Sequence, residues 1–260
     1  MTLIQSPLIW AMAASTALAG APAAQAADRA HPTVIELFQS QGCSSCPPAN
    51  ANVMALADRP DVLTLSFGVT YWDNLGWKDT FAKPQFTDRQ RAYAHALGHD
   101  QVFTPQVVVN GRIDGVGADP RELSALVQKG DRGQGGPNLS VTRDAVEIGA
   151  APAPAAGADI LLVRYDPRIV QVAIRRGENS GRTLPHRDIV RQLVHLGRWT
   201  GQPQSLPLPR SPDPVLRTAV LVQGPAGGPI LAAARLDATV VKTAELRQQG
   251  GPGSRESARL

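Results

Sequence analysis

The stretch that constrains this chain most is 42–48, which contains its only two cysteines, Cys43 and Cys46. Two cysteines separated by two residues can close a small disulfide and reopen it, and such a CxxC pair is typical of a redox motif when it lies between a strand and a helix. The flanking sequence fits that position. An apolar, β-branched run at 33–38 precedes the pair, and an apolar pattern at helical spacing follows it from Pro47 onward.

The first 26 residues predict a secretory signal peptide. An apolar segment, 8–20, is followed by small residues that end in Ala24-Gln25-Ala26, an Ala-x-Ala cleavage signal. The apolar segment is shorter than the roughly 20 residues that a membrane-spanning helix needs. We therefore expect export to the periplasm or the exterior, no membrane attachment after cleavage, and an oxidising compartment in which the two cysteines form a disulfide.

The charge balance argues against a nucleic-acid partner. A net charge of +4 over 260 residues is only mildly basic. No dense block of lysine and arginine with interleaved aromatic residues marks a nucleic-acid surface. We therefore look for the function in the cysteine pair.

Residues 31–130 predict an α/β domain with the order strand, helix, strand, helix, hairpin, helix. The strand-helix-strand part requires a parallel crossover, and Asn110-Gly111 between two β runs is a strong hairpin signal. The expected strands are 33–38, 61–69, 107–109 and 112–116, and the expected helices are 47–58, 84–97 and 119–129. A small mixed sheet flanked by helices is the thioredoxin-like arrangement.

The second half of the sequence has a different pattern, with short β runs in place of alternating strands and helices. Residues 131–138 have the composition of a linker, and 139–241 predict a smaller, mostly-β, sandwich-like domain because short β runs recur between Pro and Gly turns. The expected β runs are 141–148, 159–165, 170–175, 215–223 and 230–236, with one helix-like interruption at 187–196. The polar, Gly-rich end, 242–260, predicts a disordered tail.

Several motifs together resemble the secreted thioredoxin-like family catalogued as domain of unknown function 1223 (DUF1223). They are Val34-Ile35-Glu36-Leu37-Phe38, Ser40 to Pro48, Tyr71-Trp72-Asp73, Gly76-Trp77-Lys78-Asp79, Arg89 to Tyr93, Thr104 to Gly111, Gly177-Glu178-Asn179, Gly181 to Leu184, and Leu196-Gly197 with Trp199. The resemblance covers nearly all of the chain after the leader. It implies the fold more than the activity, because the family's name leaves its activity open.

In a CxxC of this kind we expect Cys43 to be the exposed attacking thiol and Cys46 the resolving thiol. Unpaired N–H groups at a helix start favour a thiolate. Pro47 and Pro48 have no N–H, so we expect the regular helix to begin after Cys46 rather than at Cys43, and the Cys43 thiolate to be less stabilised than in strongly oxidising members of the fold.

Further site residues are expected from the strands and the aromatic segment. The resemblance implies a cis Thr104-Pro105 bond beside the cysteines, where backbone groups pair with a bound peptide; the alternative is an ordinary trans proline that opens a strand. Glu36 interrupts a buried strand and is a candidate proton acceptor for Cys46, or else a strand-end acid that reaches solvent. Trp72 and Trp77 are candidates for an apolar peptide surface, or for packing on the sheet.

The function predicted from these residues is thiol–disulfide exchange on protein or peptide substrates, with an unidentified redox partner and no cofactor besides the Cys43–Cys46 disulfide. Two alternatives stay open. His95 and His99 share a helix face and, with the two cysteines, offer four zinc or copper ligands. The other alternative is a non-catalytic binding protein with a structural disulfide, in which the polar turn of Arg175, Arg176, Glu178, Asn179 and Arg182 carries recognition. This turn is either solvated or leans over the CxxC.

Overall fold

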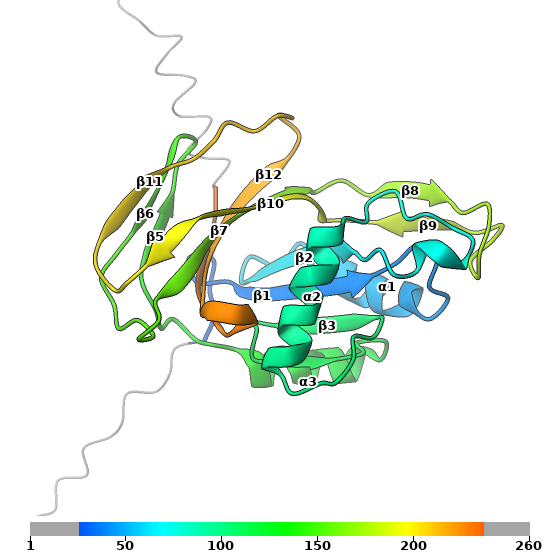
Figure 1. The fold of residues 1–260 in the computed structure, drawn as a ribbon, viewed down its shortest axis with the longest axis horizontal. Coiled ribbons are helices and arrows are strands. Elements are labelled where there is room, and N and C mark those ends of the chain that lie inside the picture. Colours follow the sequence, from blue (N-terminus) through cyan, green and yellow to red (C-terminus); the bar gives the residue numbers. More distant parts are fainter. Residues whose placement is uncertain (1–25, 237–260) are drawn as a thin grey trace, which may run out of the picture.

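The structure, a computed structural model, describes residues 26–236 and is a mixed α/β molecule with one large mixed sheet and few helices (Figure 1). The predicted leader, except for Ala26, and the predicted tail lie outside this part of the chain. Within 26–236, no helix has the length and apolar character needed to cross a membrane.

The large sheet has eight strands in the order β13-β12-β7-β10-β2-β1-β3-β4. Its strands are β1 (Thr33–Gln39), β2 (Val62–Gly68), β3 (Gln106–Val109), β4 (Ile113–Gly115), β7 (Ala158–Asp166), β10 (Ile189–Trp199), β12 (Arg217–Gln223) and β13 (Ile230–Arg235). Strand β1 pairs parallel with β2 and antiparallel with β3, as the predicted crossover and hairpin require. Strand β10 pairs parallel with β2 and antiparallel with β7, so strands from both halves of the chain lie in one sheet.

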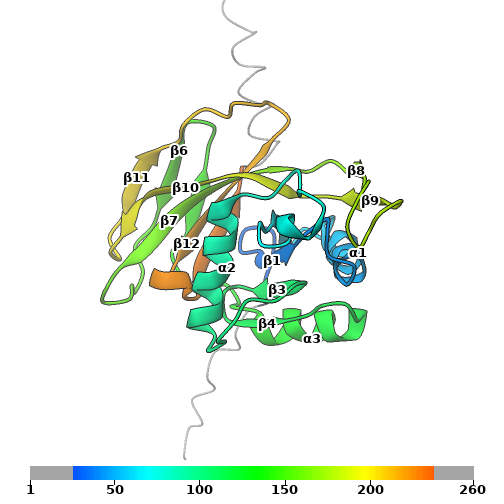
Figure 2. The same ribbon diagram turned by 45° about the vertical axis from the view of Figure 1, so that its right-hand side comes forward.

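Three helices cover the β1 region of the sheet: α1 (Cys46–Leu56), α2 (Pro84–Ala96) and α3 (Pro120–Gly130). Because side chains alternate along a strand, Ile35 and Leu37 of β1 pack with α1 and α3, whereas Val34 and Phe38 pack with α2. Figure 2 shows α2 on one side of β1 and the other two helices on the opposite side. Every residue of β1 is buried, which explains its nearly continuous apolar sequence.

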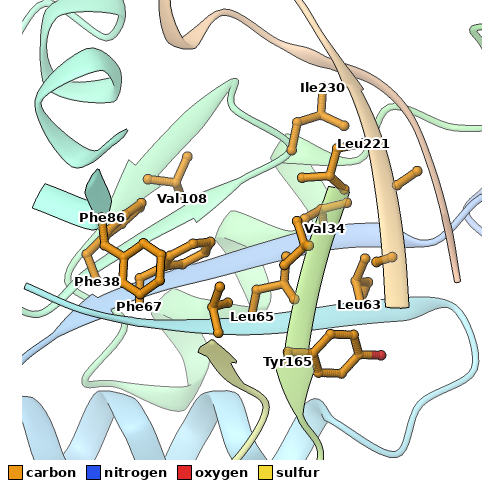
Figure 3. Packing of buried hydrophobic residues seen from close by; sticks show 14 of the residues in the cluster. Val34, Phe38, Leu63, Leu65, Phe67, Phe86, Val108, Tyr165, Leu221 and Ile230 are labelled. Carbon is orange, nitrogen blue, oxygen red and sulfur yellow. The ribbon is translucent and has the colours of Figure 1, made fainter. Parts of the chain in front are cut away.

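The core on the α2 face continues into the second half of the chain. Val34, Leu63 and Leu65 share one apolar cluster with Tyr165 and Leu221, which come from β7 and β12 (Figure 3). A smaller sheet of β5 (Leu139–Val141), β6 (Ala145–Ile148) and β11 (Gln204–Pro207) packs on the other end of the large sheet through a second cluster. The segments 31–130 and 139–241, predicted as separate domains, therefore contribute strands to a common sheet and side chains to a common core.

The helix-like pattern at 187–196 was misleading, because this segment forms β10. The pairing of β10 with β7 has register shifts between Val190 and Gln192 and between His195 and Gly197. Each irregularity inserts an extra residue and interrupts the two-residue alternation of a strand. The apolar residues are consequently spaced as in a helix, although the segment is a strand inside the sheet.

In the chain, β7 is connected to β10 by a hairpin of β8 (Val170–Ala173) and β9 (Thr183–His186). This hairpin extends toward the start of α1 (Figure 1). We call residues 170–186 the hairpin arm. Asn50 of α1 donates a hydrogen bond from Nδ2 to the carbonyl oxygen of Pro185 at 2.7 Å. Gly177, at the tip, has φ 76°, and a Cβ there would lie 3.3 Å from Cβ of Trp77, so the close approach and the backbone both favour glycine. The arm therefore lies against the region of the CxxC motif.

Candidate functional site

Cys43 and Cys46 form a disulfide at the start of α1, with their Cα atoms 5.5 Å apart. The helix begins at Cys46, after an N-cap at Ser45, and Cys43 lies in the preceding turn. The helix thus excludes Cys43, as expected from Pro47 and Pro48, but includes Cys46, one residue earlier than predicted. Because these two prolines occupy the first turn, they supply no N–H groups to an anion at the helix end.

Both cysteines are buried, which corrects the prediction that Cys43 is exposed. The exposed fraction is 0% for Cys43 and 1% for Cys46. The hairpin arm packs against this turn: fully buried Asn179 donates from Nδ2 to the carbonyl oxygens of Gln41 at 2.9 Å and of Cys43 at 2.8 Å. Asn179 lies 136 positions after Cys43, so no local pattern around the motif indicates this cover.

Thr104 and Trp72 meet at the sulfur of Cys43. The Thr104–Pro105 peptide bond is cis, as the resemblance implied. Trp72 donates from Nε1 to Oγ1 of Thr104 at 2.8 Å, and this hydroxyl donates to Sγ of Cys43 at 3.5 Å. The hydroxyl of Ser45 also lies 3.3 Å from Sγ of Cys43. The hydroxyls of Thr104 and Ser45 thus lie at this sulfur, where helix N–H groups are few. The indole N–H of Trp72 orients the Thr104 hydroxyl by donating to it.

Trp77 supports the loop rather than the sulfur. Its Nε1 donates to Oε1 of buried Gln41 at 2.9 Å. The backbone N–H of Gln41 donates to Oδ2 of Asp79 at 2.7 Å, and burial raises the pKa of this aspartic acid to about 6. These contacts fix the backbone that leads into Cys43. The packing alternative for this tryptophan is the one its contacts favour.

Glu36 is not placed to serve Cys46, which corrects its predicted role as a proton acceptor. Its carboxylate accepts hydrogen bonds from Nε and Nη2 of Arg89 at 2.8 and 2.9 Å, and a short one from the hydroxyl of Tyr93. Both partners belong to α2, so Glu36 faces the side of the sheet opposite to α1. Glu36 is fully buried, and its charge is balanced there by Arg89.

The tip of the hairpin arm places a carboxylate beside the motif. Oε2 of Glu178 accepts a hydrogen bond from the backbone N–H of Ser44 at 3.0 Å. Hydrogen bonds from Ser44 hold the pKa of this carboxyl below its usual range. The sequence analysis left open whether this polar turn is solvated or leans over the CxxC, and the contacts of Glu178 and Asn179 place it against the motif.

A cavity of about 290 Å³ lies beside Cys46, between α1 and strand β9 of the arm. It is lined by Gln39, Ser40, Cys46, Pro47, Asn50, Ala51, Arg182, Thr183, Leu184, Pro185 and His186. His186 is 3% exposed, and burial lowers its pKa to about 4. Sequence reasoning missed His186, Gln39 and Asn50, since no motif spacing links them to the cysteines.

The histidines of the metal-binding alternative are not gathered around the cysteines. His95 and His99 lie at the end of α2 and just beyond it, and His99 contacts Asp114 at 2.9 Å through Nε2. Within residues 26–236, no group of three or more His, Cys, Asp and Glu side chains is arranged to hold a metal ion. The described side chains therefore do not form the four-ligand site expected from residue types alone.

Comparison with known proteins agrees with the family indicated by the motifs. The family model described as "Protein of unknown function (DUF1223)" matches residues 34–223. The crystal structure of protein AGR_C_4864 from Agrobacterium tumefaciens is similar, with 32% sequence identity and a TM-score of 0.65, and the match covers 82% of this chain and 96% of that chain. No curated protein matches. Neither the family description nor the name of the similar protein states an activity.

Proposed function

The chain belongs to the family of proteins of unknown function DUF1223, and we propose that its own function is thiol–disulfide exchange at Cys43 and Cys46. The observation that carries the proposal is the closed disulfide at the start of α1. Its Cys43 sulfur accepts a hydrogen bond from the hydroxyl of Thr104. A hydroxyl donor stabilises a thiolate when the disulfide opens, and thiolates are the reactive species of exchange.

The wider proposal is an exported protein with a thioredoxin-like arrangement around the motif. In support, β1 leads into the CxxC, α1 follows it, and the cis Thr104–Pro105 bond precedes β3 beside it. Its partners would be thiols or disulfides of proteins or peptides and a separate redox partner that resets the pair. The direction of exchange depends on the reduction potential of the pair relative to that of its partner.

A structural disulfide in a non-catalytic protein is the second candidate function, and the burial of both cysteines favours it. It differs from the first in its chemistry: an inert disulfide does not exchange with thiols while the protein stays folded. Against it, a disulfide that closes so short a loop removes little entropy from the unfolded chain and is a weak stabiliser.

Two assays separate the candidates. Insulin reduction and the oxidation of reduced ribonuclease are measured with the wild type and with Cys43→Ser. Thiol–disulfide exchange predicts activity of the wild type in at least one direction and its loss in the variant. The absence of activity in both directions would support the structural disulfide instead.

A further inference from the structure

The cavity between α1 and β9 has one of the two cysteines, Cys46, in its wall. Its volume of about 290 Å³ lies near the lower end of the roughly 300–1,000 Å³ typical of small-molecule sites. A cavity of this size holds a small molecule with a few functional groups and is too small for a folded protein domain. Cys46 contributes to its wall, whereas Cys43 does not.

The two sulfurs, both buried, differ in their surroundings. Sγ of Cys43 is hydrogen-bonded by Thr104 and adjoins the hydroxyl of Ser45, and no such bond to the sulfur of Cys46 occurs within 26–236. In exchange, the thiol whose thiolate is more stable leaves faster. Attack on Cys46 releases Cys43 to the donating hydroxyl of Thr104, and the place of Cys46 in the cavity wall favours the same direction of attack.

The lining of the cavity indicates the chemistry of its occupant. The walls include the apolar residues Pro47, Ala51 and Leu184, and exposed Arg182, whose Nη1 donates to Oδ1 of Asn179 at 2.7 Å, lines the same cavity. Nε2 of His186 is buried and has no hydrogen-bond partner among the described residues. An apolar wall with a cation and an unpaired imidazole nitrogen suits a short carbon chain that ends in a carboxylate.

We propose that this cavity binds a low-molecular-weight thiol or disulfide that carries a carboxylate, and that such a molecule exchanges with the sulfur of Cys46 rather than with that of Cys43. The proposal rests on the exchange function proposed above and names its substrate class. It also reverses the roles expected from the sequence, in which Cys43 is the sulfur that meets the partner.

The chemistry balances with two molecules of thiol. The thiolate of the first attacks Sγ of Cys46, a mixed disulfide forms, and the bond between the two cysteines breaks. Cys43 leaves as a thiolate, bonded by the hydroxyl of Thr104, and takes up a proton. The thiolate of the second molecule attacks the sulfur of the bound molecule, which leaves as a small disulfide, and Cys46 is released as a thiolate and protonated. The forward sequence thus oxidises the small thiol, and the reverse sequence reduces the small disulfide and re-forms the Cys43–Cys46 bond.

The first test compares the reactivity of the two cysteines. Cys43→Ser leaves the Cys46 thiol and Cys46→Ser leaves the Cys43 thiol, and each variant is mixed with dithiodipropionate, a disulfide with two carboxylates. Mixed-disulfide formation is followed by mass spectrometry. We expect Cys46 to react about tenfold faster or more, and a faster reaction of Cys43 would overturn the proposal. Limited alkylation of the reduced wild type with iodoacetate, followed by peptide mapping, gives the same comparison without substitutions.

The second test addresses the carboxylate. Rates with dithiodipropionate and with the neutral bis(2-hydroxyethyl) disulfide are compared in the Cys43→Ser background, with and without Arg182→Gln. We expect the ratio of the anionic to the neutral rate to fall about fivefold, the effect of one exposed ion pair. Arg176→Gln, on the same arm but outside the cavity lining, is the control. An unchanged ratio in Arg182→Gln would remove the carboxylate from the proposal.

The tests distinguish two kinds of failure. If Cys43 reacts faster than Cys46, the cavity proposal is wrong while thiol–disulfide exchange stands. If neither thiol reacts and the insulin and ribonuclease assays are also negative, the exchange function itself is wrong, and the cavity proposal falls with it.

Discussion

Glu178 is the residue that sets the charge beside Cys43. Its carboxylate takes the N–H of Ser44, which would otherwise be available to a thiolate in the same turn. A negative charge at this place also disfavours a second one on the Cys43 sulfur. The missing N–H groups of Pro47 and Pro48 and the carboxylate of Glu178 are therefore both expected to limit the stabilisation that the hydroxyl of Thr104 gives to a Cys43 thiolate.

We expect Glu178→Gln to lower the pKa of Cys43, because the substitution removes the carboxylate charge and keeps an acceptor for Ser44. The measurement is the pH dependence of thiolate ultraviolet absorbance in a Cys46→Ser background, where Cys43 is the titrating thiol. Glu147→Gln, an exposed glutamate on β6, is the control. A pKa that does not fall would contradict the role of Glu178, and a value well below about 5 before substitution would contradict weak stabilisation.

Glu36→Gln tests the correction of that residue's role. The change leaves Arg89 buried without its charge partner, so we expect a loss of about 3–5 kcal/mol in the free energy of unfolding. Exchange per folded molecule should stay as in the wild type, because Glu36 lies on the α2 side of the sheet. Urea denaturation gives the first quantity, and the exchange rate under native conditions gives the second. Loss of exchange at unchanged stability would restore Glu36 to the site.

His186 makes the stability of the fold sensitive to acid. Burial lowers its pKa from 6.5 to about 4, so the unfolded chain takes up the proton first as the pH falls. Its contribution to stability is complete above about pH 6.5 and is lost toward pH 4. We expect the wild type to lose about 3 kcal/mol relative to His186→Asn over this interval. Denaturation at several pH values measures the difference, with exposed His95→Asn as the control; parallel curves for the wild type and His186→Asn would contradict it.

At the scale of elements, the side chains of Glu178 and Asn179 join the hairpin arm to the CxxC turn. Asn179 satisfies two backbone carbonyls of the turn, and each carbonyl left without a partner on burial costs about 1–3 kcal/mol. We expect Asn179→Ala to loosen the arm and to speed the reduction of the disulfide by a small thiol. Ser180→Ala, which removes an exposed hydroxyl of the same tip, is the control. Equal reduction rates in Asn179→Ala and the wild type would show that the arm does not limit access.

Elements defined by local signals could be predicted from the sequence. The start of α1, the turn at Asn110-Gly111 and the cap of α3 follow from short-range chemistry, and the cap is seen directly, since the carboxylate of Asp119 accepts the N–H of Arg121 at 2.7 Å. Thr104 and Trp72 were also placed at the motif correctly. These predictions depend on residues that lie near one another in sequence, or on the family resemblance.

The elements and site residues that sequence missed depend on long-range packing. The face to which Glu36 points depends on strand register, and a shift of one residue reverses it. The strand character of β10 was hidden by its register irregularities. The place of His186 depends on the path of the hairpin arm, whose contacts join residues more than a hundred positions apart. Such contacts have no local sequence signature.

At the scale of the whole molecule, the site is built from both halves of the chain. The first half supplies the disulfide, Thr104 and Trp72, and the second half supplies the cover and one wall of the cavity. The large sheet continues from one half to the other through the pairing of β2 with β10. The site therefore depends on the joint folding of segments that the sequence predicts as two domains.

Because the sheet is continuous, the unfolding of a fragment of residues 27–137 tests whether the first half folds as a separate domain. Without the second half, Val34, Leu63 and Leu65 lose their packing against Tyr165 and Leu221, so we expect the fragment to lack cooperative unfolding.

Two variants of residues 27–236 report on the two halves separately. Trp199→Phe leaves the tryptophans of the first half as fluorescence reporters, and the double variant Trp72→Phe/Trp77→Phe leaves Trp199. We expect the fluorescence transition of each variant to coincide with its own far-ultraviolet circular dichroism transition. Fluorescence and circular dichroism that separate, or a fragment that unfolds cooperatively on its own, would support the two-domain division. Coincident transitions would mean that opening the site and unfolding the sheet belong to one cooperative unit, so that access to the disulfide must come from local motion of the hairpin arm.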